Sequence, residues 1–473
     1  MTARTTGSPT NTPSPGRHRW LAACCVAGLS ACNLGPGYQR PDVPPPAAWT
    51  GADAQAAAAW PSADWWKGFG SPQLDAFMAQ SRQANDDIAA AIARVRQADA
   101  QARIAGAALL PTLDASFDAS QTRTQGSSGS HTGATFSPLL SASYALDFWG
   151  KNRATRDAAV AAANASRYDR ATVELTVMSS VAGTYFQTLS LRDRLDVAQK
   201  NLDAAQTILN GLKLQQQAGT ANALDVAQQA TTVATLYAAI PPLKQQLRQS
   251  VDALAILVGA TPESVEVNSG TLDGVAQPQV APGLPSELLA RRPDVAEAEA
   301  QLISANADMA AARAAFFPSI VLTASGGYAS DQLAGLLNPS NAIFSVAAGI
   351  TQPIFEGGLL QGQSELAKGR YAELAADYHK AVISAFGNVE DALVAVQQTA
   401  EQEQRQQEAV NTAQRAYEIA QAQMHAGTIN VLTLLNTESA LFTAQDALAQ
   451  VKFSHLQALV NLFSALGGGW QQA

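Results

Sequence analysis

An internal repeat constrains the fold of this chain more than any other feature of its sequence. Pro111 and Pro318 stand in matching stretches, ALLPTLDASFD and AFFPSIVLTASG, 207 residues apart. Gly219 and Gly427 stand in QAGTANALDV and HAGTINVLTL, 208 residues apart. LDFWGKNR matches PIFEGGLL, and LAILVGA matches LFSALGG, at the same two spacings. The chain is therefore read as two copies of a unit of about 200 residues that fold alike.

Each copy predicts a helix, two short strands and two long helices, in that order. The helices are expected over residues 74–109, 151–218, 222–258, 286–316, 358–426 and 428–466, and the strands over 112–119, 140–148, 319–328 and 342–354. In the long helices apolar side chains recur every seven residues, for example at Val226, Val233 and Ile240, which is typical of coiled-coil packing. The AGT triplet after each of the longest helices predicts a turn, with glycine just beyond the last helical residue.

The strand segments alternate between apolar and polar side chains. Leu113, Ala115 and Phe117 alternate with Asp114 and Ser116, so one face of the first strand is apolar and the other is polar. Each segment has about ten residues, which is the length of a tilted transmembrane β-strand. The polar stretch QTRTQGSSGSHTGA predicts a solvent loop between the first two strands.

Four strands are too few to close a barrel in a membrane. At least eight strands are needed, and an open sheet edge is not tolerated in lipid. The chain is therefore expected to oligomerise. Two copies would give eight strands and barely a lumen, whereas three copies would give twelve strands and a lumen wide enough for water.

The N-terminus has the pattern of a bacterial lipoprotein signal. The basic stretch RHR is followed by an apolar segment over 20–29 and then by LSAC, which resembles a lipobox. In a lipobox the cysteine, here Cys32, is acylated and becomes the new N-terminus; the alternative is an ordinary signal peptide with an incidental cysteine. Asn33 follows in place of the aspartate that retains lipoproteins at the inner membrane, so the outer membrane is the expected location. The Pro-rich stretch 35–46 predicts an extended strap leading away from this anchor.

These features predict six segments along the chain. They are a signal peptide over 1–31, a lipid-anchored N-terminal segment and belt over 32–73, the first repeat over 74–258, an equatorial connector over 259–285, the second repeat over 286–466 and a C-terminal tail over 467–473. The connector and the two terminal segments are expected to form a belt against the helices.

The composition excludes several classes of function. Charged residues make up 15% of the chain and the formal net charge is −9, so no basic surface for nucleic acid is expected. The cysteines, Cys24, Cys25 and Cys32, all lie near the N-terminus, so the rest of the chain forms neither a disulfide nor a Cys-ligated metal site. No P-loop, G-x-S-x-G motif or pair of histidines at metal spacing occurs. We therefore predict no enzyme activity, no catalytic residue, no metal and no cofactor beyond a covalent lipid on Cys32.

Motifs spread along the chain point to one family. They include the repeat, the lipobox, PIFEGG, AGT-x-N-x-L and the stretch RRPDVAEAEAQLISANADMAAARAAFFPSI. Together they resemble the outer-membrane factors, which are the TolC-like channels of tripartite efflux systems, over nearly the whole chain from Cys32. The stretches DWWKGFGSPQLDAFMAQSRQAN and GPGYQRP are similar to the NodT-like lipoprotein branch, which serves resistance-nodulation-division pumps.

The resemblance implies both a fold class and a set of partners. The fold class is mostly α with transmembrane β: a homotrimer with a 12-stranded β-barrel continued by a long α-helical barrel. The partners would be outer-membrane lipid, a periplasmic adaptor and an inner-membrane resistance-nodulation-division pump. Drugs or other small toxic molecules would leave passively through the lumen.

The resemblance also implies a gate at the periplasmic end of the helices. It places the tip at two turns, whose candidate residues are Gly219, Thr220, Gly427 and Thr428. Relatives often carry an acid one or two helix turns beyond, projecting into the pore. This chain has Asp225 after the first turn, but Asn436 where relatives often have aspartate. We therefore predict Asp225, Leu432 and Asn436 as gate candidates, and interhelical packing is the alternative role for them.

Two other functions remain open from the sequence. One is the outer-membrane duct of a type I secretion system, which belongs to the same class of channel. The other is a lipid-anchored periplasmic coiled-coil scaffold, in which the strands would be soluble hairpins. A scaffold explains the heptads but not four amphipathic strands.

Overall fold

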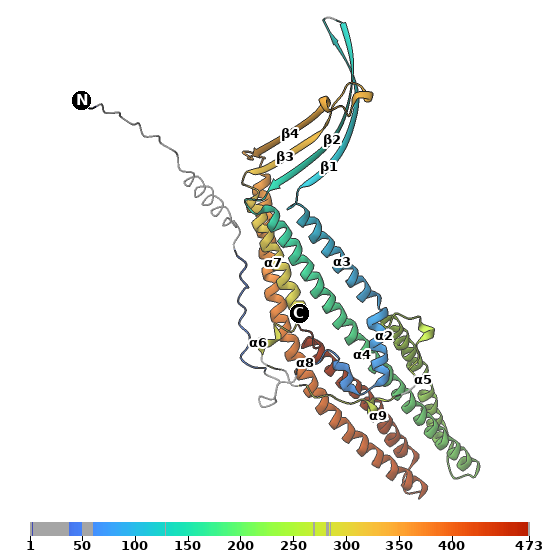
Figure 1. Ribbon diagram of the computed structural model, residues 1–473. Coiled ribbons are helices and arrows are strands. Elements are labelled where there is room, and N and C mark those ends of the chain that lie inside the picture. The colour runs from blue at the N-terminus through green and yellow to red at the C-terminus, as the bar shows by residue number, and fades with distance from the viewer. Residues whose placement is uncertain are drawn as a thin grey trace. The chain divides into compact units, whose positions relative to one another are not determined.

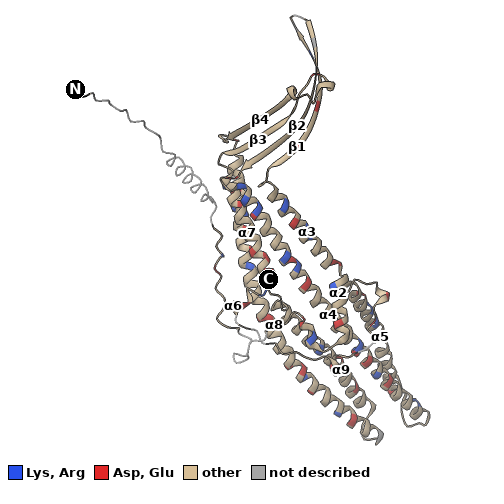
Figure 2. Ribbon diagram, in the orientation of Figure 1, with Lys and Arg blue, Asp and Glu red and all other residues tan. Residues whose placement is uncertain are grey.

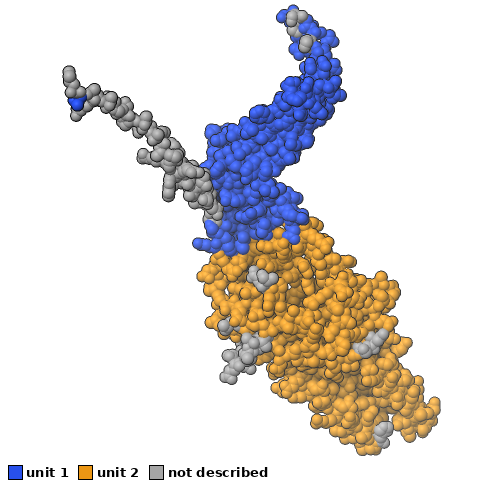
Figure 3. Space-filling view, viewed as in Figure 1, with its two compact units in different colours: residues 1–39, 99–162, 302–374 blue, residues 40–98, 163–301, 375–473 orange. Residues whose placement is uncertain are grey.

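The computed structural model describes residue 2 and residues 37–49, 60–127, 129–267, 270–280, 283 and 285–471. The chain divides into two compact units (Figure 3). Unit 1 consists of Met1–Gln39, Asp99–Ala162 and Leu302–Leu374, and unit 2 of Arg40–Ala98, Ala163–Gln301 and Ala375–Ala473. Neither unit is one sequence repeat, because each takes corresponding parts of both copies. Cys32 and the predicted signal peptide lie outside the described residues.

The elements follow the predicted order in both repeats (Figure 1). They are η1 (Trp65–Phe69), α2 (Pro72–Ala84), α3 (Asp86–Ala107), β1 (Thr112–Gly126), β2 (Gly129–Leu146), α4 (Lys151–Gln217), α5 (Ala223–Leu257), η2 (Pro262–Ser264), η3 (Leu272–Gly274), α6 (Pro285–Leu288), α7 (Pro293–Ala314), β3 (Ser319–Tyr328), η4 (Leu333–Gly335), η5 (Pro339–Asn341), β4 (Ala342–Thr351), α8 (Leu359–His425) and α9 (Val431–Ala465). Within the described part of the chain, no helix combines the length and the apolar character needed to cross a membrane.

The helix expected over 74–109 is two helices, so the prediction of one continuous helix was wrong. Asn85 separates α2 from α3 with an extended backbone (ψ 128°). Its Oδ1 accepts a hydrogen bond from the backbone N–H of Ile88 at 3.1 Å, which caps α3. Its Nδ2 donates to the carbonyl of Leu257 at 3.0 Å. The asparagine therefore ends one helix, starts the next and joins both to the end of α5.

The second repeat shows a comparable difference at the same place. The helix expected over 286–316 is interrupted after the short α6, and the longer helix α7 begins at Pro293. Proline is favoured at the first position of a helix, because its missing N–H would have no intrahelical partner there.

The first hairpin is longer than the sequence predicts. The stretch expected as a solvent loop continues β1 to Gly126 and β2 back to Gly129, with Thr124 opposite His131. In this stretch both faces of the strands carry polar residues. The alternation of apolar and polar residues that marks a strand in the sequence is therefore lost, although the backbones remain paired. β3 and β4 lie at 319–328 and 342–351, close to the prediction.

The four strands form one antiparallel sheet in the order β1-β2-β3-β4. One row of paired residues across the sheet is Leu113, Ala142, Ala324 and Val346, and the adjacent row is Asp114, Ser141, Ser325 and Ser345. Adjacent rows point to opposite faces of a sheet. The alternation predicted strand by strand therefore combines into one apolar face and one polar face.

The apolar face carries large side chains that no described part of the chain covers. On β4, Phe344, Val346 and Ile350 are 87%, 79% and 70% exposed. The strands contain few charged residues, whereas the helices carry both signs along their length (Figure 2). A face this apolar and this exposed is expected to meet lipid or another protein.

In unit 1 the sheet is joined to the helices by side chains at the strand ends. The indole Nε1 of Trp149 donates to the carbonyl of Pro318 at 2.7 Å, and its ring stacks on Phe317 at 4.9 Å between centroids. The carboxylate of Asp147 accepts from the backbone N–H groups of Asn152 and Arg153 at 2.9 and 2.8 Å. Asp147 thus caps the start of α4, where a negative charge is favourable.

Unit 2 has an aromatic core shared by both repeats. Trp65 of η1 stacks on Phe463 of α9 with ring centroids 5.0 Å apart. Phe69, also in η1 and fully buried, packs on Phe186 of α4 at 4.9 Å. Leu272 of the connector joins the same cluster. The N-terminal segment, the connector and helices of both copies therefore share one hydrophobic core.

Candidate functional site: the paired helix turns

The turn after α4 has the hydrogen bonds of a Schellman motif. Gly219 has a positive φ of 79°, which glycine adopts without strain. Its N–H donates to the carbonyl of Gln216 at 3.0 Å, and the N–H of Thr220 donates to the carbonyl of Gln215 at 2.9 Å. The hydroxyl of Thr220 donates to the same Gln215 carbonyl at 3.1 Å. The AGT triplet therefore closes the helix end with backbone and side-chain bonds together.

The turn after α8 repeats this arrangement. Gly427 has φ 71°, and its N–H donates to the carbonyl of Met424 at 3.0 Å. The N–H and the hydroxyl of Thr428 both donate to the carbonyl of Gln423, each at 3.0 Å. The four predicted tip residues thus form two equivalent turns in unit 2.

Asp225 takes part in the cap that starts α5. Asn222 Oδ1 accepts from the N–H of Asp225 at 2.9 Å, and Asp225 Oδ2 accepts from the N–H of Asn222 at 3.3 Å, which is a capping box. In the second repeat Asn430 Oδ1 accepts from both the N–H and the hydroxyl of Thr433, at 3.0 and 2.9 Å. Asp225 and Thr433 occupy equivalent positions, but only Asp225 closes a capping box, because the Thr433 hydroxyl donates to the Asn430 side chain. Asp225 therefore has a structural role whether or not it also lines a pore.

Leu432 and Asn436 lie together on one face of α9. They are four residues apart, so they follow one another along that face. Both are exposed in the single chain, with Leu432 at 51%, and so is its repeat equivalent Leu224 at 63%. Exposed leucines this close to both turns fit surfaces covered by a neighbouring chain or lining a pore. The gate role of Asp225, Leu432 and Asn436 remains a prediction.

Glu438 is a residue that sequence reasoning missed. It is fully buried, and neither carboxyl oxygen has a hydrogen-bond partner within the described residues. Burial raises its pKa to about 7, and the nearby Gln229 partly opposes this rise. A sequence signal exists, because Glu438 lies between Leu434 and Leu441 at coiled-coil spacing, where an apolar residue is expected.

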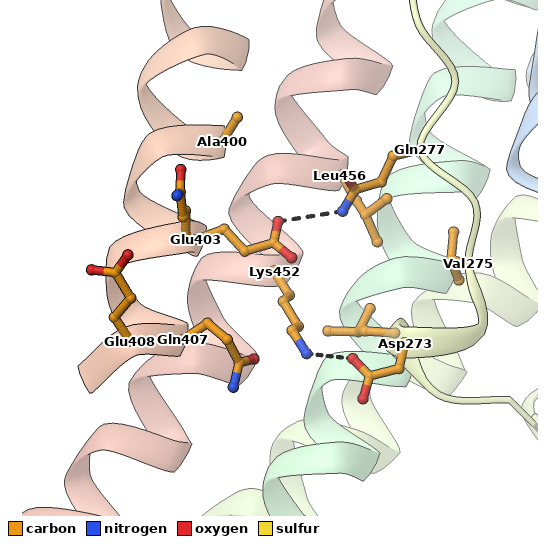
Figure 4. Close-up of a pocket in the computed structure, with 11 residues that line it drawn as sticks. Asp273, Val275, Gln277, Ala400, Glu403, Gln407, Glu408, Lys452 and Leu456 are labelled. Atoms are coloured by element: carbon orange, nitrogen blue, oxygen red, sulfur yellow. Dashed lines mark hydrogen bonds and ion pairs between the residues drawn. The ribbon is translucent and has the colours of Figure 1, made fainter. Parts of the chain in front are cut away.

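The connector binds helices of both repeats. The Nη1 of Arg192 on α4 donates to the carbonyl of Val267 at 2.7 Å, and Lys452 of α9 pairs with Asp273. The Nε2 of Gln277 donates to Glu403 of α8 at 3.3 Å (Figure 4). These last contacts border a cavity of about 490 Å³ between the connector, α8 and α9. The connector therefore holds α4, α8 and α9 together at one level of unit 2.

The described part of the N-terminal strap starts after the predicted lipidation site, Cys32, which lies outside the described residues. Its residue Arg40 forms a two-pronged ion pair with Glu299 of α7, at 2.6 and 2.5 Å. The indole Nε1 of Trp49 donates to the carbonyl of Gly283 at 2.7 Å, and its ring packs on Phe386 of α8 at 6.2 Å. Arg40 of the strap and Trp49 just after it thus fix this segment to unit 2 by charge, hydrogen bonding and aromatic contact.

The chain has two matched helical hairpins with capped turns and a sheet with one apolar and one polar face. These features are those of a subunit that forms a channel in a membrane. The sequence profile of the outer membrane efflux protein family matches residues 78–260 and 284–468, one segment on each repeat. The chain belongs to this family. It is therefore an outer-membrane exit channel of a tripartite efflux system that extends into the periplasm, and it is not an enzyme.

Individual relatives agree with this assignment over nearly their whole length. The chain is 40% identical over 460 residues to the pyoverdine export outer membrane protein OpmQ of Pseudomonas aeruginosa, covering 95% of this chain and 96% of the relative. It is 33% identical over 468 residues to the toluene efflux pump outer membrane protein TtgF of Pseudomonas putida, covering 95% and 97%. Among solved structures, the outer-membrane channel OprN has a TM-score of 0.88 at 25% identity, covering 93% of this chain and all of that one.

These similarities confirm the fold class predicted from the sequence. The four strands are one chain's share of a 12-stranded transmembrane β-barrel in a trimeric channel, and the long helices are its share of an α-helical barrel. They favour the efflux channel over the type I secretion duct and over the coiled-coil scaffold.

Proposed function

We propose that three copies of this chain receive small toxic molecules from a periplasmic adaptor and an inner-membrane resistance-nodulation-division pump. The observation that supports this most directly is the equivalence of the two turns, which share their hydrogen bonds and their threonine caps. A homotrimer would present six such turns in a ring. A ring of six similar ends suits a partner that is itself built from repeated hairpins.

The cargo is set by the pump, because a passive lumen has no binding site of its own to select it. The relatives named above differ in their named cargo, pyoverdine in one and toluene in another. Because pyoverdine export is named for two relatives at 40% identity, pyoverdine is the first cargo to test.

Cross-linking from the turns tests the partner assignment. A photoreactive residue at Ala426, which is exposed beside the second turn, should cross-link to a periplasmic adaptor in living cells. The same residue at Glu365, exposed near the opposite end of α8, is the matched control and should not. Mass spectrometry identifies the product. Cross-links from Glu365 but not Ala426 would contradict a docking site at the turns.

We also propose that Cys32 carries the lipid and that the strap over 35–46 leads from it to unit 2. The ion pair of Arg40 and the contacts of Trp49 support this path, because they fix the strap's far end. The barrel alone holds a trimer in the membrane, so the lipid is a second anchor. Cys32→Ser behind a cleavable signal should lower the amount of SDS-resistant trimer in outer-membrane fractions several-fold, with residual channel activity. Wild-type trimer levels would exclude a role for the lipid in assembly.

A further inference from the structure

The carboxyl group of Glu438 lies in an apolar environment close to the turns. The surrounding cluster includes Tyr417, Leu434, Leu441 and Phe442 from α8 and α9. Both carboxyl oxygens of Glu438 are buried, and neither is hydrogen-bonded to any residue that the structure describes. An unpaired buried carboxylate is costly, because it loses its hydration without gaining a partner. The carboxyl group is therefore a candidate for a neutral, protonated state in the packed helices.

The nearest polar group comes from the other hairpin. Gln229 of α5 is fully buried beside Glu438, and its Nε2 donates to the carbonyl of Ala205 on α4 at 2.9 Å. Its Oε1 has no partner among the described residues. A free amide oxygen can accept a hydrogen bond from a protonated carboxyl. The amide of Gln229 also lowers the pKa of Glu438, but by less than burial raises it. The unpaired Oε1 of Gln229 can therefore pair with Glu438 when Glu438 carries a proton.

Among the described residues, no charged group compensates an ionised Glu438 from the helices packed against it. Tyr417 of α8 is the titratable group that interacts with it; burial raises the pKa of this phenol and the Glu438 charge raises it further, while its Oη accepts a hydrogen bond from Gln421 at 2.8 Å. α5 presents the neutral Gln229, and α4 presents the carbonyl of Ala205 and the side chain of Ile208.

The position of the pair matters for opening. Glu438 follows the α9 cap residue Asn430 by eight residues, and Gln229 follows the α5 cap residue Asn222 by seven. At about 1.5 Å per residue both lie about 10–12 Å behind the turns. The two hairpins must separate at this level if the tips are to splay apart.

We propose that Glu438 is a protonation-controlled positioning residue of the gate, whose protonated carboxyl bonds to Gln229 and holds the α8–α9 hairpin against the α4–α5 hairpin. This inference rests on the proposed gate at the helix turns. Loss of the proton leaves a buried charge, and Gln229 offsets only part of the cost of burial. This favours separation of the hairpins and access of water to the carboxylate.

The direction of the pH effect follows from the two protonation states. In the packed form the pKa of Glu438 is raised to about 7, whereas in a separated, hydrated form it returns towards the ordinary 4.5. Packing is therefore favoured below the ordinary value and weakens progressively as pH rises to about 7, by at most about 300-fold in the packed-to-separated ratio. The channel should be tighter at acidic than at neutral or mildly alkaline pH.

Conductance of the full-length protein in planar bilayers between pH 5 and 8 tests the proposal. The wild type should conduct more as pH rises towards and through about 7. Glu438→Gln, which keeps a donor for Gln229 at every pH, should stay at the low-pH level throughout. Glu418→Gln removes the same charge at an exposed site of α8 at a similar height and should follow the wild type. If Glu438→Gln retains the wild-type pH response, the proposal is overturned.

Two further measurements keep the test decisive if Glu438→Gln assembles poorly. Gln229→Met removes the acceptor at similar size and should already leak at pH 6; a tight Gln229→Met channel would contradict the pairing. In wild-type trimers, the infrared band of a protonated carboxyl should disappear between pH 6 and 8. If conductance does not depend on pH while this band titrates, Glu438 is not coupled to the gate, although the protein still forms a channel. If no conductance is seen, both this proposal and the proposed channel function are contradicted.

Discussion

Val346→Arg should abolish the assembled channel in the outer membrane. Val346 lies in the middle of β4, is 79% exposed and belongs to the apolar face of the sheet. An arginine on the lipid face of a membrane barrel costs about 2–4 kcal/mol near the bilayer midplane, and a trimer carries three of them. We expect loss of SDS-resistant trimer from outer-membrane fractions and loss of the efflux phenotype.

The adjacent residue provides a matched control for this prediction. Ser345 points to the opposite, polar face, where its hydroxyl lies 2.9 Å from that of Ser325. Ser345→Arg places the same charge one residue away but towards the lumen side, at the cost of one exposed hydrogen bond. Trimer levels should stay near those of the wild type. Equal loss in the two variants would show that the faces are wrongly assigned.

Asn436→Ala should raise the leak through the closed channel several-fold in bilayer conductance. The reason is its place on an exposed face of α9, one helical turn from Leu432 and close to the second tip turn. Loss of a polar side chain from a narrow ring widens the ring and removes hydrogen-bonding groups between chains. Unchanged conductance would remove Asn436 from the gate.

Asp225→Ala should also leak, because a carboxylate is lost from the pore. This effect must be separated from the loss of the helix cap. Removing a capping side chain costs about 1 kcal/mol and frays the start of a helix. In the second repeat Asn430 caps α9, and the Thr433 hydroxyl, at the position equivalent to Asp225, donates to the capping side chain. Thr433→Ala therefore weakens a cap without removing an acid and is the matched control. A leak in Asp225→Ala alone identifies the carboxylate as part of the pore. An equal leak in both variants assigns the effect to the caps.

The parts of the fold that depend on local pattern could be predicted from the sequence. Alternation within single strands is enough to place Leu113 and Val346 on the same face, because every strand is paired with its neighbour in register. The AGT triplets predict two equivalent turns, because Gly219 and Gly427 sit where only glycine is unstrained. Both signals depend on residues close together in the sequence.

The parts that depend on distant partners could not be predicted. Asn85 breaks a helix because it binds both Ile88 and the carbonyl of Leu257, which is far away in the sequence. Glu438 stands at a heptad position where an apolar residue is expected, but its lack of partners depends on the helices packed around it, which the pattern does not show. Asp225 is suggested as a pore acid by family resemblance, but its capping box depends on backbone geometry.

The mixing of both repeats within each compact unit has a consequence for how many molecules must meet. A single copy of the repeat would bring two strands, so twelve strands would require six separate chains. Joining two copies in one polypeptide halves that number and fixes which neighbours pair, since β2 and β3 are already paired within the chain. It also frees the two copies to differ, as the Asp225 and Thr433 caps do. The channel is thus a ring of six related repeat units, in which every second connection between neighbouring units is a covalent link within one chain.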